Sequence, residues 1–145
     1  MARFAVDTSC MVAAVCGWHA HHEAALTAID ARLARGDRIA VAGPALVESY
    51  AVLTRLPAPH RLGPSDAWAL IEANFVSQAD VVGLDGPECV SLLRAMVAQG
   101  ISGGRTYDAV IATCARKAGA GELLTLNRRH FDQVSGGTAI IDPTV

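Results

Sequence analysis

Short apolar runs alternate with amphipathic helical segments along the chain, and this alternation restricts the fold more than any other feature. Strands are predicted at residues 3–6, 38–43, 79–85, 122–126 and 138–142, and helices at about 20–34, 44–56, 65–76, 87–99 and 105–117. A strand, a helix and a parallel strand are joined by a right-handed crossover, so helices cover both faces of the sheet. The sequence therefore predicts an α/β fold, in which helices enclose a mostly parallel sheet of four to five strands.

The length of the chain indicates one domain. Its 145 residues are enough to bury about two-thirds of the surface that the unfolded chain exposes, and no linker or repeat divides them. The longest apolar run, Met11–Cys16, is much shorter than a membrane-spanning helix, and no signal-peptide pattern precedes it. We therefore expect a single domain over residues 1–145, located in the cytoplasm and without membrane contact.

Charge and cysteine content limit the kinds of site that the chain can carry. The net charge of −2 argues against a general basic surface that grips nucleic acid. The cysteines form no C-x-x-C pair and have no zinc-finger spacing with histidines; they are Cys10, Cys16, Cys89 and Cys114. We expect buried, reduced thiols, with neither a zinc site nor a disulfide.

Asp7 lies at the carboxyl end of the first predicted strand, and Thr8 or Ser9 is expected to cap the helical segment that follows. In an open parallel sheet, ligands bind in the crevice beyond the carboxyl ends of the strands. Asp7 is therefore a candidate site residue. A helix cap or a turn residue is the alternative interpretation, because aspartate is favoured at both positions.

Two further acids fall on predicted helix faces that are otherwise apolar. Glu48 shares its face with alanine and valine side chains, and Asp108 shares its face with isoleucine and alanine side chains. An unpaired charge is costly to bury, so each acid needs a partner. In the simplest account Arg55 pairs with Glu48 and Arg105 pairs with Asp108, although isolated buried ion pairs add little net stability.

A shared cation accounts for all three acids together. Carboxylates that crowd into one place repel one another unless a cation neutralises them, and hard oxygen ligands suit Mg²⁺ or Mn²⁺. Ions held in this way activate a water and hold a phosphodiester in line, with Asp7 as the natural bridging ligand. Asp7, Glu48 and Asp108 therefore predict a metal site that carries out phosphoryl chemistry.

Three blocks of the sequence resemble the signatures of PIN-domain ribonucleases, and more closely those of the VapC toxins of bacterial toxin–antitoxin systems. The blocks are FAVDTSCMVA (4–13), PALVESYAVLTRL (44–56) and RTYDAVIATCARKAGAGELLTLNRRHF (105–131). They span nearly the whole chain in the order of the family. The resemblance implies the α/β/α sandwich of a PIN domain and a Mg²⁺- or Mn²⁺-dependent endoribonuclease.

The resemblance also assigns roles to single residues. Asp7, Glu48 and Asp108 match the three core acids of the family.

A fourth acid commonly follows the late strand in a TLD or TxD context, and here the motif reads TLN, with Asn127 in place of the acid. The Asn127 carbonyl could bind a metal or orient a water, although one negative charge is lost. Asp132 would replace the fourth acid only if the turn after Asn127 folded back. Residues expected from position alone to orient water or phosphate are Thr8, Ser9, Arg105 and Thr106.

The resemblance implies three partners. VapC-like proteins cleave RNA, usually form homodimers, and are inhibited by a small antitoxin that inserts a segment near the acidic pocket. We therefore expect an RNA substrate, a VapB-like antitoxin and a homodimer. A basic antitoxin residue beside the acids would be consistent with charge pairing.

Other segments have less specific interpretations. In WHAHHEA (18–24), His19 and His22 share a helix face, but two imidazoles without a third ligand favour a solvated helix start over a metal site. The two tryptophans are expected in packing or in a dimer contact. RRHF (128–131) is expected near the acids, where it would meet RNA phosphate or a base, or form a surface turn.

Two rival functions stay open on the sequence. Aspartyl-phosphate phosphatases also place a nucleophilic aspartate at the end of a first strand, but they resemble DxD there, and this chain has Asp7-Thr8-Ser9. The general acid of that mechanism is therefore missing. A non-catalytic binding module on a PIN scaffold is the second rival, which Asn127 favours and the three retained acids oppose.

Overall fold

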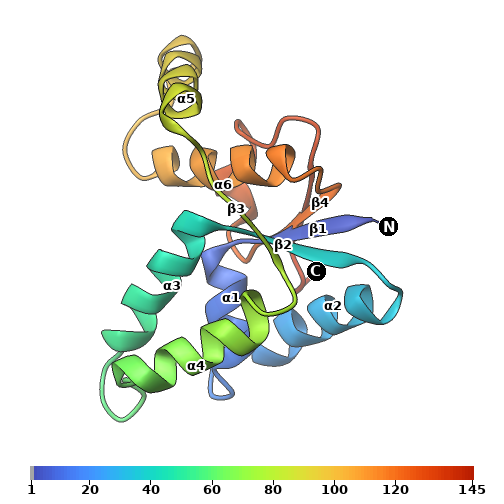
Figure 1. Cartoon of the computed structure of the whole chain (residues 1–145), viewed down its shortest axis with the longest axis vertical. Helices are drawn as coiled ribbons and strands as arrows, with labels where there is room; N and C mark the ends of the chain where they lie inside the picture. The colour runs from blue at the N-terminus through green and yellow to red at the C-terminus, as the bar shows by residue number, and fades with distance from the viewer. Residues whose placement is uncertain (1) are drawn as a thin grey trace.

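The computed structural model describes residues 2–145 and confirms the α/β architecture (Figure 1). In chain order, the elements are β1 (Arg3–Val6), α1 (Thr8–Val15), α2 (His22–Ala34), β2 (Arg38–Ala42), α3 (Gly43–Thr54), α4 (Pro64–Phe75), β3 (Asp80–Val82), α5 (Gly86–Gln99), α6 (Arg105–Lys117), β4 (Glu122–Leu124), the short 3₁₀ helix η1 (Arg128–Phe131) and β5 (Ala139–Ile141). The predicted helix over residues 105–117 agrees with α6 at both ends.

The sheet has five strands in the order β3-β2-β1-β4-β5, and every neighbouring pair is parallel. Helices α1 to α4 lie on one side of this sheet, while α5 and α6 lie on the other, with α5 projecting away from it (Figure 1). The core is built on the central strands, where Phe4, Leu123 and Leu124 are completely buried. The protein is therefore a single α/β domain of three layers.

Strands β3 and β4 end earlier than the sequence patterns predict, because polar side chains redirect the backbone. After β3, Asp85 caps α5 by accepting a hydrogen bond from the Glu88 N–H, and Glu88 reciprocates with the Asp85 N–H. After β4, the N–H groups of Leu126 and Asn127 bond to hydroxyl oxygens of Ser9 and Thr125. Because the N–H groups of Leu126 and Asn127 bond to side chains, they do not pair with a neighbouring strand, and the chain turns at the carboxyl edge of the sheet.

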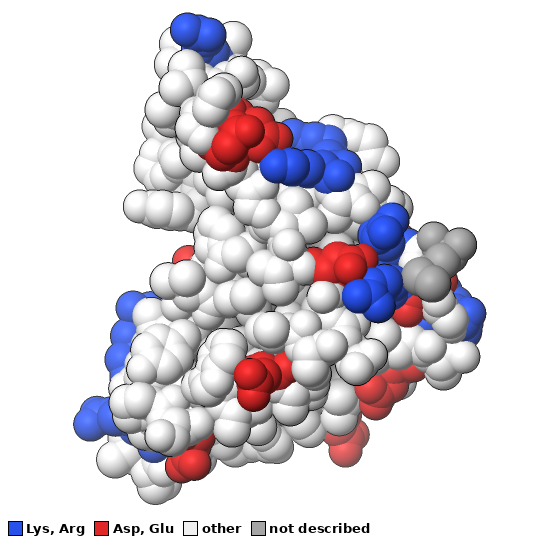
Figure 2. Space-filling view, in the orientation of Figure 1, with Lys and Arg blue, Asp and Glu red and all other residues white. Residues whose placement is uncertain are grey.

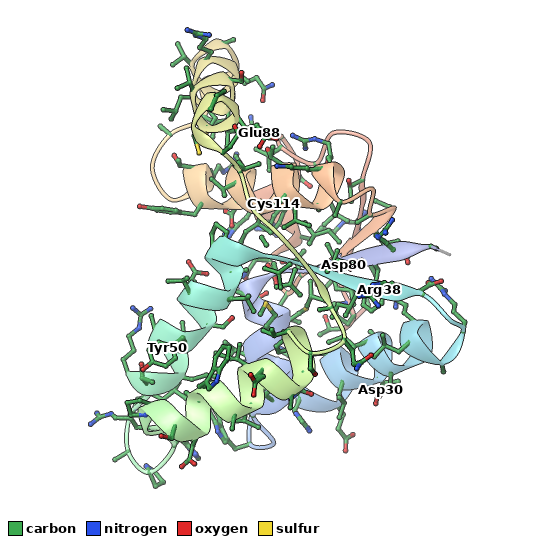
Figure 3. All side chains as sticks on the ribbon, viewed as in Figure 1. Asp30, Arg38, Tyr50, Asp80, Glu88 and Cys114 are labelled. Carbon is green, nitrogen blue, oxygen red and sulfur yellow. The ribbon has the colours of Figure 1, made fainter. Side chains whose placement is uncertain are left out.

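Several charged side chains on this face pair with an opposite charge. Asp80 accepts bonds from the guanidinium groups of Arg3 and Arg38, at 3.1 and 2.8 Å, and Figure 3 labels Arg38 and Asp80 side by side. Figure 2 shows red and blue groups adjacent to one another at this place and again near α5, where Lys117 and Glu88 pair at 2.7 Å. This face therefore carries no extended basic field.

An ion pair joins α2 to β4. Glu122 accepts bonds from Arg32 Nε and Nη2, both at 3.1 Å, and a third from Arg35 at 3.2 Å. The hydrogen bond from Arg32 is the largest cause that holds the pKa of Glu122 below its usual value. Since Arg32 is mostly buried, this pair stabilises the docking of α2 on the sheet more than an exposed pair would.

Glu122→Gln is expected to lower the free energy of unfolding at neutral pH by about 1–2 kcal/mol, through loss of charge-assisted hydrogen bonds. A carboxylate with a lowered pKa in the folded state stabilises the fold above its unfolded pKa, and this stability is lost as the pH falls through the folded pKa. The difference between variant and wild type should therefore vanish in acid. Urea titrations at several pH values test this, with Glu23→Gln on α2 as the control. An equal loss in acid would contradict the account.

The cysteines are all free thiols, but only Cys10, Cys16 and Cys114 are buried. Cys89 is exposed on α5, so the prediction of four buried thiols is wrong for this residue. The reason is that Met96 is the single fully buried residue of α5, and most of the helix surface faces solvent. In residues 2–145, no helix combines the length and the apolar character needed to cross a bilayer.

Candidate active site

A cavity of about 450 Å³ opens at the carboxyl edge of the sheet, beside the ends of β1 and β4. Figure 1 shows α3 and α6 approaching each other at this edge, on the side away from the chain's N-terminus. The lining residues are Asp7, Thr8, Ser9, Val12, His19, His21, Glu48, Val52, Asp108, Ile111, Leu126 and Asn127. All four predicted catalytic positions therefore line one cavity, here called the acid cavity.

Asp7 is the N-cap of α1 as well as a wall of the acid cavity. Its Oδ1 accepts hydrogen bonds from the Cys10 N–H at 3.0 Å and from Ser9 Oγ at 2.6 Å. Its Oδ2 accepts a bond of 2.5 Å from Thr125 Oγ1. The prediction that Thr8 or Ser9 caps this helix is therefore wrong, because Asp7 itself reaches the free N–H group. The cap interpretation of Asp7 is therefore confirmed, and a cap at this position still leaves the residue in the wall of the acid cavity.

Burial makes the Asp7 carboxylate costly to ionise. The residue is only 4% exposed. Burial is the main cause that raises the pKa of Asp7, and the charge of Asp108 raises it further, while the bonds from Ser9, Thr125 and Cys10 lower it. Because the pKa remains raised, the hydrogen bonds only partly compensate the buried charge. A cation in the cavity would complete the compensation.

Thr8 provides an unmatched polar atom in the same wall. Its Oγ1 is buried and is the single buried side-chain oxygen or nitrogen without a hydrogen-bond partner among the described residues. Buried hydroxyl groups almost always have a partner in folded proteins. An oxygen of this kind beside Asp7 suits a water or a cation in the acid cavity.

Glu48 lies at the opening of the cavity and is exposed, which differs from the predicted buried face. The buried stripe of α3 consists of Ala45, Ser49 and Leu53, one turn apart from one another. Glu48 lies beside this stripe, on the cavity side. No ion pair joins Glu48 to Arg55 within residues 2–145, so the pairing predicted as the simplest account is wrong.

Asp108 enters the cavity from the first turn of α6, with 21% of its side chain exposed. Burial is the main cause that raises its pKa; the charge of Glu48 adds to the increase, while His130 and Arg105 oppose it. The predicted ion pair with Arg105 is not formed, because that guanidinium donates to Gln133 Oε1 at 2.6 Å. The side chain paired with Asp108 is His130, whose Nδ1 lies 3.7 Å from Asp108 Oδ2.

Asn127 is exposed where the acid cavity meets a second cavity of about 420 Å³. This second cavity, here called the cationic cavity after its two arginines, is lined by Leu126, Asn127, Arg128, Arg129, His130, Asp132 and Asp142. The carboxylates of Asp132 and Asp142 are part of the same wall and balance the formal charge of the arginines. Asp132 therefore faces the cationic cavity and is not among the residues that line the acid cavity, because η1 carries the chain onward after Asn127.

Several residues of the site were not singled out from the sequence. Thr125 fixes one oxygen of Asp7, although only its place in the TLN motif marked it. His19 and His21 line the acid cavity, whereas the histidine segment was interpreted as a solvated helix start. Asp142 follows β5, so the strand-end argument used for Asp7 would have found it. Thr8 and Ser9, which were expected from their position to orient water or phosphate, line the acid cavity. Arg105 and Thr106, which were expected to do the same, do not line it.

The donor set fits a hard divalent ion. Within residues 2–145, no three His, Cys, Asp or Glu side chains are close enough to hold a metal by themselves. Magnesium is usually held by one or two carboxylates together with waters and substrate phosphate, so a complete protein cage is not required. Oxygen donors dominate the cavity wall, two of its carboxyls have raised pKa values, and Thr8 Oγ1 lacks a partner.

Comparison with known protein families gives one match over most of the chain. The model of the PIN domain family matches residues 4–137. Two ribonucleases of Mycobacterium tuberculosis are similar in sequence. VapC40 is 38% identical over 128 residues, covering 88% of this chain and 89% of the relative, and VapC27 is 36% identical over 138 residues, covering 88% and 87%.

Solved structures share the fold at lower identity. A DNA-bound VapBC complex from Salmonella typhimurium contains a chain that aligns with a TM-score of 0.69 at 21% identity, over 99% of both chains. VapC20 of M. tuberculosis, described as a toxin that cleaves the sarcin–ricin loop, aligns with a TM-score of 0.66 at 18% identity, over 94% of this chain and 96% of that chain. At these identities the structural matches support the fold alone.

Proposed function

We propose that this chain, which belongs to the PIN-domain family and to its VapC group, is a metal-dependent endoribonuclease that acts as the toxin of a type II toxin–antitoxin system. One observation carries the proposal. Asp7, Glu48 and Asp108 come from β1–α1, α3 and α6, and they meet on one cavity without the arginine partners that would make them structural ion pairs. Acids left free at a sheet's carboxyl edge are suited to catalysis.

In this proposal, different residues of the acid cavity bind the ion, position a carboxylate and accept a proton during hydrolysis. Asp7, Asp108 and Glu48 would hold Mg²⁺ or Mn²⁺, and the Asn127 carbonyl can replace the family's fourth acid as an oxygen donor. When bound, the ion lowers the pKa of a water and offsets the negative charge of the phosphate. Ser9 and Thr125 hold the Asp7 carboxylate in place through hydrogen bonds of 2.6 and 2.5 Å. Glu48, the exposed acid of the cavity, would accept the proton of the attacking water.

Cleavage of RNA under controlled metal conditions tests this function. The purified protein, freed of any partner, is incubated with total bacterial RNA in Mg²⁺, in Mn²⁺ and in EDTA. Discrete fragments that need a divalent ion support the proposal. A folded, metal-binding protein that cuts no RNA in any of these conditions would support the binding-module alternative. Hydrolysis of a small phosphomonoester without RNA cleavage would support the phosphatase alternative.

The cationic cavity is the adjoining surface suited to RNA phosphate. Arg128 and Arg129 are exposed, and no hydrogen bond or ion pair of either guanidinium occurs among the described residues. The cavity shares Leu126 and Asn127 with the acid cavity, so an RNA strand can pass from one to the other. Free arginines next to a phosphate-cleaving site are suited to the flanking phosphates.

Arg128→Ala and Arg129→Ala are each expected to weaken RNA binding. The logarithm of the binding constant falls as the logarithm of the salt concentration rises, and each substitution should make this fall less steep by about 0.7, the value for one single-strand phosphate contact. The effect should be the same for different sequences, because phosphate contacts carry no sequence information. Binding of a labelled single-stranded RNA to an Asp7→Asn background across a salt series measures the slope. Arg94→Ala, an exposed arginine on α5, is the control. An unchanged slope in both variants would remove these arginines from the proposal.

The proposed toxin function also implies partners for this chain. The similar solved structures include a DNA-bound VapBC from S. typhimurium and VapBC2 from Rickettsia felis bound to a DNA fragment from their promoter. By analogy, we expect this chain to act in the cytoplasm on RNA, to form a homodimer, and to be inhibited by a VapB-like antitoxin. A basic antitoxin side chain placed in the acid cavity would neutralise Asp7 and Asp108, and would exclude a divalent ion by competition.

A further inference from the structure

Four aromatic and imidazole rings gather beside the acid cavity, on two loops far apart in sequence. Trp18, His19 and His21 lie between α1 and α2, and His60 lies between α3 and α4. The rings of Trp18 and His60 are stacked, with centroids 4.2 Å apart and planes at 21°. His19 lies 5.8 Å from Trp18 and 5.8 Å from His21 in tilted arrangements. We call these four side chains the indole–imidazole cluster.

The cluster is continuous with the acid cavity. His19 and His21 line that cavity together with Asp7, Glu48 and Asp108. Trp18 is 48% exposed, so much of its ring faces solvent rather than the core. The cavity volume of about 450 Å³ falls within the range of about 300–1,000 Å³ that is usual for sites of small ligands. A phosphate at the acids therefore leaves room for an attached nucleoside beside the rings.

We propose that the indole–imidazole cluster is a nucleobase subsite, in which an unstacked base of the RNA packs on Trp18 and His19 while its phosphate lies at the acids. This inference rests on the proposed nuclease function and adds a base-recognition element to it. Unpaired RNA bases stack on tryptophan and histidine rings, and every base has the π-face that this contact needs. A base held in a duplex is stacked on its neighbours and is not available.

The ring of His19 is held for such a contact. Its Nδ1 accepts a hydrogen bond of 3.0 Å from the His21 N–H, so this nitrogen carries no proton. In the neutral ring the proton is therefore on Nε2, which is the nitrogen left for a ligand. A neutral ring with one fixed donor can stack on a base and also donate to one of its acceptors. His19 is thus a positioning residue for substrate and not a catalytic base.

A metal site is the competing use of so many histidines. Within the part of the chain that the structure describes, no three His, Cys, Asp or Glu side chains lie in a metal-binding arrangement. His22, the first residue of α2, has its Nδ1 2.9 Å from the Ala13 carbonyl oxygen. The observed geometry of this cluster is that of stacked and tilted rings, which is the geometry a nucleobase would extend.

Tryptophan fluorescence provides a readout that does not depend on cleavage. The chain has two tryptophans, Trp18 and Trp68, which are 48% and 47% exposed. In an Asp7→Asn background, Trp68→Phe leaves Trp18 as the reporter, and Trp18→Phe leaves Trp68. Titration with a single-stranded RNA 12-mer of mixed sequence should quench Trp18 in a saturable manner and leave Trp68 unchanged. A duplex of the same sequence should quench Trp18 much less, and equal quenching would overturn the requirement for an unstacked base.

Affinity measurements complete the test. Trp18→Ala should weaken binding of the labelled 12-mer about 5- to 150-fold, and Trp18→Phe should restore most of it. His60→Ala, which removes the stacking partner, should weaken binding in the same direction. Trp68→Ala, at an equally exposed tryptophan outside the indole–imidazole cluster, should have no effect. Circular dichroism verifies the fold of each variant.

The outcomes separate the subsite from the nuclease. If the protein cleaves RNA, but RNA does not quench Trp18 fluorescence and Trp18→Ala binds RNA as tightly as the wild type, the subsite is overturned and the nuclease is supported. Trp18 quenching by RNA in a protein that cuts no RNA would support the subsite and overturn the nuclease. Quenching together with metal-dependent cleavage supports both.

Discussion

Asp7→Asn is expected to abolish metal-dependent RNA cleavage, by at least about 1,000-fold, while the protein remains folded. The loss is expected because the carboxylate at the end of β1 is the most buried acid of the cavity and, in the proposed function, would hold the divalent ion. Removal of its charge forfeits several kcal/mol of stabilisation for the charge that develops on the phosphate, and each 1.36 kcal/mol corresponds to about a tenfold change in rate.

The fold should survive because asparagine caps helices about as well as aspartate does. The amide oxygen of Asn can still accept from the Cys10 N–H and from Ser9 Oγ, as Asp7 Oδ1 does. Asp7→Ala, in contrast, removes the cap and should cost about 1 kcal/mol or more of stability in addition to activity. The two substitutions therefore separate the structural role of Asp7 from its proposed catalytic role.

Single-turnover cleavage of RNA in Mg²⁺, together with circular dichroism and thermal unfolding, measures both roles. Asp30→Asn is the matched control, because Asp30 is exposed on α2, away from the residues that line the acid cavity (Figure 3). The control should cleave RNA at the wild-type rate. An Asp7→Asn variant that retains a tenth of the wild-type rate would remove Asp7 from the centre of the mechanism.

The fold was predictable because its pattern is repeated along the chain. Each strand is too short to be assigned alone, but five of them separated by helical segments fix a parallel sheet. That sheet then places Asp7 and the TLN motif at one edge, since both follow adjacent parallel strands. Two of the four expected acid-cavity positions, Asp7 and Asn127, are therefore positions that element order determines.

Features that depend on packing direction were not predictable. A helical wheel shows which residues share a face with Glu48, but not which face turns to the core, and the buried stripe of α3 is the neighbouring one. The contribution of His19 and His21 depends on a loop without periodicity, packed beside α3 residues that are distant in sequence. Likewise, the stacking of Trp18 on His60 joins two loops that no local pattern relates.

A second large effect is expected on stability, and it depends on pH and on metal. Burial raises the pKa of both Asp7 and Asp108. An acid whose pKa is raised by folding contributes stability that is fully present below its unfolded pKa and is lost as the pH rises through the folded pKa. The free energy of unfolding of the wild type should therefore decrease, relative to that of Asp7→Asn, as the pH rises above about 4, the ordinary pKa of aspartate.

The difference between the two proteins is the quantity to measure, because other acids change stability in the opposite direction. Glu122, Asp80 and Asp142 have lowered pKa values, so they lose stabilising interactions as the pH falls. Their contribution is common to wild type and variant and cancels in the subtraction. Urea unfolding at pH values from about 4 to 8 gives the difference; a difference that stays constant over this range would contradict a raised pKa at Asp7.

Divalent ions should reverse this penalty. An ion that binds only the folded state adds about 2.7 kcal/mol of stability at a concentration 100 times its Kd. Because the carboxylates must be ionised to bind it, the increase should be greatest at neutral pH and small near pH 4. Asp7→Asn should lose most of the increase, whereas Asp30→Asn should keep it. The cavity would then be a site that is strained without its ion, in which the cost of burying Asp7 is recovered when a cation binds.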